Sequence, residues 1–229
     1  MSLLGDRSVW VFDLDNTLYP AHLTVYDAIG HRMTAFVQHL TGLDAPAALA
    51  LQDGYFDQYG ATIVGLMRHH ACDPQRFMDD VHDVPLDDIA PDPELARLLA
   101  HLPARRFVFT NGAHAYARRV LDRLGIAHLF ERVIALDDID FVPKPEPRAF
   151  QLMTALARFD PTRAVMVEDH ARNLAPAAAM GFATVLVRPP EAPLDPDAGA
   201  SYIHHHAAHV KDALRGHFSP PLALAPGRD

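Results

Sequence analysis

The run Val9-Trp10-Val11-Phe12-Asp13-Leu14-Asp15-Asn16-Thr17 is the strongest indication of fold class in this chain. It opens with apolar residues, β-branched or aromatic, which are typical of a strand buried on both faces of a parallel sheet. Asp13 and Asp15 follow at once, and residues two apart on an extended chain point to the same face. Because ligands of open parallel sheets bind beyond the carboxyl ends of the strands, these carboxylates are candidate site residues.

Further short apolar runs share the composition of the first, being rich in Val, Phe or Ile. They are residues 107–109, 132–136, 164–167 and 184–187. From residue 107 onward they alternate with segments of helical pattern. These are residues 115–124, 146–159 and 172–180. Strand and helix in alternation predict an α/β fold, a parallel sheet flanked by helices with right-handed crossovers.

The long interval after Thr17 contains no strand-like run and has the pattern of several helices. They are residues 24–40, 46–60, 62–70 and 74–81, with turn signals at Thr41-Gly42 and Asp73-Pro74 between them. We therefore predict a small helical domain inserted after the first strand. The chain is expected to return to the core through a helix that ends at Leu102, and a last helix is expected over residues 201–218.

Composition narrows the classes of function. The chain has 229 residues, of which 49% are hydrophobic, so it can form one large domain or a domain with a smaller insert. The net charge of −9 argues against a nucleic-acid binder, which needs a basic face, but allows a small anionic substrate. No stretch approaches the ~18 consecutive apolar residues of a membrane span, and no signal peptide is recognisable. We expect a cytoplasmic protein.

Three more segments place reactive groups at strand ends or in a constrained loop. Thr110-Asn111-Gly112 follows the second strand, where a hydroxyl and two amides can contact an anion. Lys144 lies between two prolines, which restrict its backbone and suit a fixed positive charge. Glu168-Asp169 ends a later strand as a second acidic pair.

Each of these segments has an ordinary structural alternative. Asp and Asn are common in turns, so the first acidic run alone is no better evidence for a site than for a turn. Delivered together to the same edge of one sheet, the segments favour a site that binds phosphate and a metal. Carboxylate oxygens suit Mg²⁺, and a cation relieves the repulsion between neighbouring carboxylates.

In this order, the motifs resemble those of the haloacid dehalogenase superfamily, on its phosphatase side. The matching segments are Asp13-Leu14-Asp15-Asn16-Thr17, Thr110-Asn111-Gly112, Lys144 and Glu168-Asp169. The resemblance extends to about Val187. It implies a Rossmannoid core made of residues 1–18 and 88–229, with a helical cap at residues 19–87.

The resemblance also implies a role for each motif residue. Asp13 would attack phosphorus and form an aspartyl-phosphate, and Asp15 would act first as acid and then as base. The Mg²⁺ ligands would be Asp13, the main-chain carbonyl of Asp15, Asp169 and, directly or through water, Glu168. Thr110 and Lys144 would stabilise the phosphoryl oxygens, while Asn111 and Gly112 would add contacts to the substrate.

Asp15 also bears on the type of reaction. Dehalogenating members lack an acid two residues after the nucleophile, so the resemblance implies phosphate esters, although a phosphomutase shares this acid. A closer likeness is to pyrimidine 5′-nucleotidase-type members, in the Asn-Thr-Leu-Tyr ending at Tyr19 and in residues 168–173. It implies a nucleoside monophosphate such as UMP or CMP as the small phosphorylated partner. The alternatives are a sugar-phosphate or phosphoglycolate phosphatase and a non-catalytic protein that binds phosphate esters.

Residues of the inserted segment are candidates for contacting the leaving group. They are Tyr19, Tyr55, Arg68, His69 and His70. Helix packing is the alternative for Tyr55, and a favourable helix-terminal position is the alternative for the two histidines.

The cluster His204-His205-His206, with His209, suggests a transition-metal site. No carboxylate or cysteine with ligand spacing accompanies it, so we expect these side chains to lie on a solvated helix face.

Overall fold

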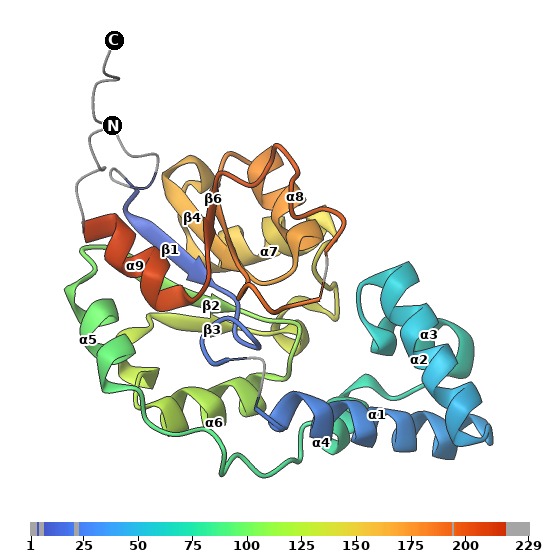
Figure 1. Cartoon of the computed structure of the whole chain (residues 1–229). Coiled ribbons are helices and arrows are strands. Elements are labelled where there is room, and N and C mark those ends of the chain that lie inside the picture. The colour runs from blue at the N-terminus through green and yellow to red at the C-terminus, as the bar shows by residue number, and fades with distance from the viewer. Residues whose placement is uncertain (1–3, 5–6, 21–22, 194, 219–229) are drawn as a thin grey trace.

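A computed structural model describes residue 4 and residues 7–20, 23–193 and 195–218 of the chain (Figure 1). Within these residues, parallel strands form a single sheet in the order β3-β2-β1-β4-β5-β6. The strands are β1 (Val9–Phe12), β2 (Arg105–Phe109), β3 (Arg132–Ile134), β4 (Ala164–Glu168), β5 (Ala183–Val187) and β6 (His205–Ala207). The predicted α/β fold with a parallel sheet is therefore confirmed. The order reverses between β1 and β4, and ligands bind at such a switch point.

The sheet has an apolar cluster on each face. Trp10 and Phe12 of β1 belong to one cluster, and Val9 and Val11 belong to the other. Helices of the core cover both faces (Figure 1). They are α5 (Pro93–His101), α6 (His114–Leu124) and α9 (Val210–Phe218) on the first face, and α7 (Pro147–Ala157) and α8 (Ala171–Ala179) on the second. Burial on both sides explains why β1 has no polar alternation.

Between β1 and α5 the chain is helical, as the sequence predicts. The helices are α1 (Val25–Thr41), α2 (Ala45–Tyr59), α3 (Thr62–His70) and α4 (Pro74–Val81). They lie beyond the carboxyl ends of the strands, at the lower right of Figure 1. Asp44 and Asp73 cap α2 and α4 by accepting backbone N–H groups, and Gly42 and Gly60 end α1 and α2 in the left-handed conformation. The domain boundaries at residues 18/19 and 87/88 stay a prediction.

The structure corrects the prediction for the C-terminal part of the chain. The expected helix over residues 201–218 begins only at Val210, because His205–Ala207 forms β6 and pairs with β5. Nδ1 of His204 lies 3.1 Å from the backbone nitrogen of Thr184 and 2.9 Å from its hydroxyl, which fixes this segment beside β5. His204, His205 and His206 therefore lie on an extended segment, and His209 lies directly before α9, so the expectation of a helix face is wrong.

Short 3-10 helices interrupt the loops of the core. They are η1 (Ala127–Leu129), η2 (Leu136–Ile139) and η3 (Pro161–Arg163). Because η2 begins at Leu136, the strand predicted over residues 132–136 ends early, at Ile134. Among the described residues, every helix is too short or too polar to cross a membrane.

Candidate active site

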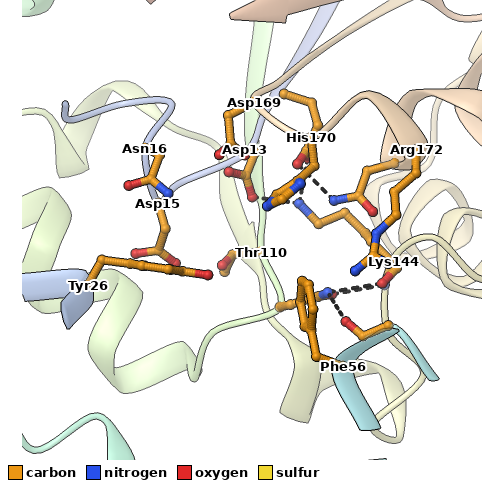
Figure 2. Close-up of a pocket in the computed structure, with 14 residues that line it drawn as sticks. Asp13, Asp15, Asn16, Tyr26, Phe56, Thr110, Lys144, Asp169, His170 and Arg172 are labelled. Carbon is orange, nitrogen blue, oxygen red and sulfur yellow. Dashed lines mark hydrogen bonds and ion pairs between the residues drawn. The ribbon is translucent and has the colours of Figure 1, made fainter. Parts of the chain in front are cut away.

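Asp13 lies directly after the end of β1, and Asp15 lies in the turn that follows. The Asp13 N–H donates to the Val167 carbonyl at 2.8 Å, which continues the pairing with β4 by one residue. The chain then turns, with the Leu18 N–H donating to the Leu14 carbonyl at 2.9 Å. Asn16 lies in this turn with a φ of 61°, a conformation that asparagine tolerates better than most residues. Both carboxylates line one cavity, which we call the phosphate cavity (Figure 2).

Lys144 lines this cavity and is buried, with a relative exposure of 2%. Its Nζ lies 2.5 Å from Oδ1 of Asp13, 2.7 Å from Oε2 of Glu168 and 3.1 Å from the carbonyl of Phe109. An ammonium has three hydrogens to donate, and these partners use all of them. Lys144 is thus placed to hold Asp13 and to offset the repulsion between carboxylates.

Asn111 holds the loop that carries Lys144. Its Oδ1 accepts the Lys144 N–H at 2.9 Å, and its Nδ2 donates to the Lys144 carbonyl at 3.1 Å. The side chain predicted to bind substrate is therefore engaged with the backbone of the lysine. This arrangement fixes the position of the ammonium relative to β1 and β4.

Thr110 and Gly112 form a small turn at the end of β2. The Gly112 N–H donates to Oγ1 of Thr110 at 2.9 Å, so this amide does not point at an anion as the sequence suggested. The Thr110 hydroxyl accepts that bond and keeps its own hydrogen for another acceptor. Thr110 lines the phosphate cavity, as predicted.

The acidic residues form a group with metal-binding geometry. Asp13, Glu168 and Asp169 each offer a carboxylate oxygen, and these oxygens lie within 4.8 Å of one another. Oε1 of Glu168 accepts from Nδ2 of Asn173 at 2.8 Å and Oε2 accepts from Lys144, which together orient the carboxylate.

The electrostatics of this group indicate that it needs a cation. Burial and the Glu168 charge raise the pKa of Asp13 to about 7, against the opposing effect of Lys144. Burial and the same Glu168 charge also raise the pKa of Asp169. A single ammonium does not balance these carboxylates, whereas a divalent cation with oxygen ligands does. The residues present therefore fit Mg²⁺.

Asp15 is held by two tyrosines on one of its oxygens. Oδ1 accepts from the hydroxyl of Tyr19 at 2.5 Å and from that of Tyr116 at 2.8 Å. Burial and the Asp15 charge raise the pKa of both phenols, so both stay protonated as donors. Tyr19 is only 2% exposed, and it contacts Asp15 instead of the leaving group that the sequence suggested. Tyr116, on α6, was missed because no motif distinguishes it.

The structure does not bring Arg68 and His69 to a described cavity near the site. The Arg68 guanidinium lies 4.7 Å from the centre of the Tyr59 ring, and Nε2 of His69 lies 2.8 Å from the Tyr59 hydroxyl. His70 is bonded in the same way to Tyr55, at 2.9 Å. These residues contact one another between α2 and α3, and their role as substrate contacts has no geometric support.

Other residues that line the phosphate cavity were not predicted as site residues. They include Tyr26, Phe56, His170 and Arg172 (Figure 2). The guanidinium of Arg172 lies 4.4 Å from the centre of the Phe56 ring, so it connects α8 to α2. Its position in the first turn after the acidic pair is the sequence signal that could have identified it.

A second cavity of about 430 Å³ adjoins the phosphate cavity, and we call it the distal cavity. Asp15 lines both cavities. Most of the remaining wall comes from α1, α2, α3 and α4 and is apolar, including Ile29, Met33, Ile63 and Phe77. The site thus combines a small, charged end with a larger, mostly apolar one.

Comparisons with known proteins identify the family and several relatives of this chain. Residues 8–181 match a family model described as haloacid dehalogenase-like hydrolase. The chain is similar to Phosphate metabolism protein 8 of Saccharomyces cerevisiae, at 30% identity over 79% of this chain and 61% of the yeast protein. It is also similar to Fructose-1-phosphate phosphatase YqaB of Escherichia coli, at 28% identity over 78% of this chain and 95% of that protein.

Solved structures share the fold. An L-2-haloacid dehalogenase superposes with a TM-score of 0.61 at 18% identity, covering 93% of this chain and 99% of the other. At this identity the likeness concerns the arrangement of helices and strands.

The match to the yeast protein spans less than two thirds of its length, so that protein contains further sequence outside the shared part.

Proposed function

Because this chain belongs to the haloacid dehalogenase-like hydrolase family, we propose that it hydrolyses small phosphomonoesters with Asp13 as nucleophile. The observation that carries the proposal is the convergence of Asp13, Asp15, Thr110 and Lys144 on one cavity beside the acidic group. Phosphoryl transfer requires positioning and charge neutralisation above all, and these side chains supply both.

The proposed reaction has two steps. Lys144 binds Oδ1 of Asp13, so Oδ2 is the oxygen we assign to the attack on phosphorus. The bond from phosphorus to the ester oxygen breaks, and Asp15 gives that oxygen a proton. Water then attacks the aspartyl-phosphate, the Asp15 carboxylate takes the proton, and inorganic phosphate leaves with Asp13 regenerated.

Mg²⁺ belongs to this proposal as the cofactor. Its ligands would be the Asp13 and Asp169 carboxylates and the Asp15 carbonyl, with Glu168 directly or through water. When bound, the ion neutralises charge on the transferring phosphoryl group. Thr110 donates its hydroxyl hydrogen to a phosphoryl oxygen, and Arg172 adds a positive charge at the edge of the cavity.

A nucleoside 5′-monophosphate is the proposed substrate. The distal cavity has the size and the mostly apolar wall of a small-molecule site, with polar groups such as Gln52 and His82 available to a base or ribose. In this proposal residues 19–87 act as a cap over the leaving group. A sugar phosphate is the second candidate, favoured by the similarity to the fructose-1-phosphate phosphatase.

Phosphate release from a panel of esters with Mg²⁺ tests the proposal. We expect UMP and CMP to be turned over faster than fructose 1-phosphate. Tenfold faster release from sugar phosphates would make the second candidate the function. The Asp13→Asn variant should lose activity while keeping its fold, and unchanged release in this variant would rule out the covalent mechanism. A wild type that binds the esters and hydrolyses none would be a binding protein.

A further inference from the structure

The phosphate cavity and the distal cavity meet at Asp15 but differ in charge. Lys144 and Arg172 line the phosphate cavity, where the phosphoryl group would lie. Among the described residues, the distal cavity has neither a lysine nor an arginine in its wall. It does contain two carboxylates, Asp15 at its inner end and Asp53 of α2. Positive charge is thus confined to the end that takes the phosphate.

The position of Asp15 determines where the leaving group lies. A third hollow borders the phosphate cavity on the metal side, with Asn16, Asp169, Arg172 and Arg188 in its wall. Asp15 does not line it. Because Asp15 must reach the ester oxygen, the leaving group extends into the distal cavity, away from these arginines.

His82 adds no positive charge to the distal cavity. Its Nδ1 lies 2.9 Å from the Met78 carbonyl, so Nδ1 carries the hydrogen and Nε2 remains an acceptor in the neutral ring. The residue is 9% exposed, and burial lowers the pKa of the imidazole. The wall around it is mostly apolar and includes Ile29 and Phe77, which offer no positive charge either.

From this distribution we propose that the distal cavity selects phosphomonoesters whose leaving group carries no negative charge. The inference rests on the proposed function, because it concerns the alcohol released at Asp13. Like charges repel, and among the described residues no lysine or arginine lines the distal cavity to offset that repulsion. Nucleoside monophosphates and simple sugar phosphates both satisfy the rule, whereas phosphoglycolate, with its carboxylate, does not.

Matched pairs of substrates test this selection. Each pair differs by one carboxylate. In glycerol 3-phosphate and 3-phosphoglycerate, and in 2-hydroxyethyl phosphate and phosphoglycolate, it replaces a CH2OH group of similar size. In UMP and orotidine 5′-monophosphate it replaces a ring hydrogen. Assays with Mg²⁺ at about pH 8 keep His82 and His170 neutral. We expect kcat/KM for the anionic member to be lower by at least about tenfold in each pair.

Two variants on α2 locate the source of the discrimination. Asp53→Asn removes a carboxylate from the distal cavity. The ratio of kcat/KM for the neutral member to kcat/KM for the anionic member should therefore fall by about threefold in each pair. Asp57→Asn removes the same charge one turn further along the helix, where it lines the hollow on the metal side, and should leave the ratio unchanged.

The outcomes are distinct. Equal kcat/KM within the pairs would overturn the inference and leave the phosphatase function standing. An Asp53→Asn ratio equal to that of the wild type, or a larger effect of Asp57→Asn, would overturn the assignment to the distal cavity. No release of phosphate from any ester would overturn the proposed function and this inference together.

Discussion

Two tyrosine hydroxyls hold one oxygen of the Asp15 carboxylate and leave the other oxygen available. Tyr19 and Tyr116 both donate to Oδ1, and their own oxygens lie 3.0 Å apart. In the proposed mechanism, Oδ2 is therefore the oxygen that exchanges a proton with the ester or with water. A carboxylate fixed in this way needs no reorientation between the two proposed steps, in which it first gives and then takes a proton.

Tyr116→Phe tests this positioning role. We expect kcat to fall by about tenfold to a hundredfold with KM little changed, because Asp15 loses one donor and Tyr116 lines neither the phosphate cavity nor the distal cavity. Tyr59→Phe is the control, since the Tyr59 hydroxyl contacts His69 outside the described cavities. Steady-state kinetics on UMP measure both. A folded Tyr116→Phe enzyme with normal kcat would show that the hydrogen bond is merely structural.

Lys144 gives a second prediction at this scale, on stability. Lys144→Met should lower the free energy of unfolding by about 3–5 kcal/mol in EDTA, because it leaves Asp13 and Glu168 buried without their cation. Lys211→Met is the matched control. Lys211 pairs with Asp92 at 2.8 Å but is 31% exposed, so its loss should cost at most about 1 kcal/mol. Equal losses in urea unfolding would contradict the role assigned to Lys144.

The sequence predicted the charged residues of the site far better than their neighbours. Asp13, Lys144 and Glu168 are recognisable because charged side chains beside buried strands are rare unless they pair with one another or bind a ligand. Tyr116 is one aromatic residue on an amphipathic helix, and its contact with Asp15 depends on how α6 packs. Asn111 was recognised, but its bonding to the Lys144 backbone could not be, since the two are far apart in sequence.

At the level of elements, the end of α2 touches the lysine loop. Gly60 ends the helix with a φ of 81°, and a Cβ at this position would lie 2.6 Å from the Lys144 carbonyl oxygen. The close approach requires glycine for its lack of a side chain as well as for its backbone conformation.

Gly60→Ala and Gly42→Ala separate these two requirements. Gly42 ends α1 with a φ of 75° and has open space around a Cβ, so its substitution should cost only about 1–2 kcal/mol of backbone strain. Gly60→Ala should cost about 1–3 kcal/mol more and should also lower kcat, because the Lys144 loop must shift. Urea unfolding and kinetics on both variants test this. Identical behaviour would mean that the contact with the loop is unimportant.

Strand β6 illustrates why short elements escape sequence analysis. His205–Ala207 has neither an apolar run nor an alternating pattern, and it lies beside residues with helical character. What makes it a strand is the exposed edge of β5, whose backbone needs hydrogen-bond partners. By contrast β1 and β4 are buried on both faces, so their composition alone was sufficient.

For the whole molecule, we expect the acidic group to couple metal binding to stability and pH. The pKa of Asp13 is raised to about 7 from an ordinary value of 3.8, so the folded protein holds this proton more tightly than the unfolded chain. The protonated Asp13 side chain therefore stabilises the folded state fully below about pH 4, and this stabilisation is lost as the pH rises toward about 7. Mg²⁺, the proposed cofactor, would bind the deprotonated carboxylates and should restore the lost stability.

We expect the difference in Tm between Mg²⁺ and EDTA to grow from about pH 5 to about pH 8. In Asp13→Asn the growth should be smaller, because one titrating ligand is gone. Thermal unfolding at several pH values measures this. A difference in Tm that stays constant with pH would contradict the coupling between these carboxylates and the metal.

The larger hydrophobic cluster has a consequence for how the molecule unfolds. It includes Ile63 and Leu66 of α3 and Met78 of α4, and also Phe12 of β1 and Val165 of β4. The helices over the distal cavity and one face of the sheet thus share a continuous apolar interior. Heating should therefore unfold these helices and the sheet as one cooperative unit. A chain cleaved between α4 and α5 would expose apolar surface on both fragments.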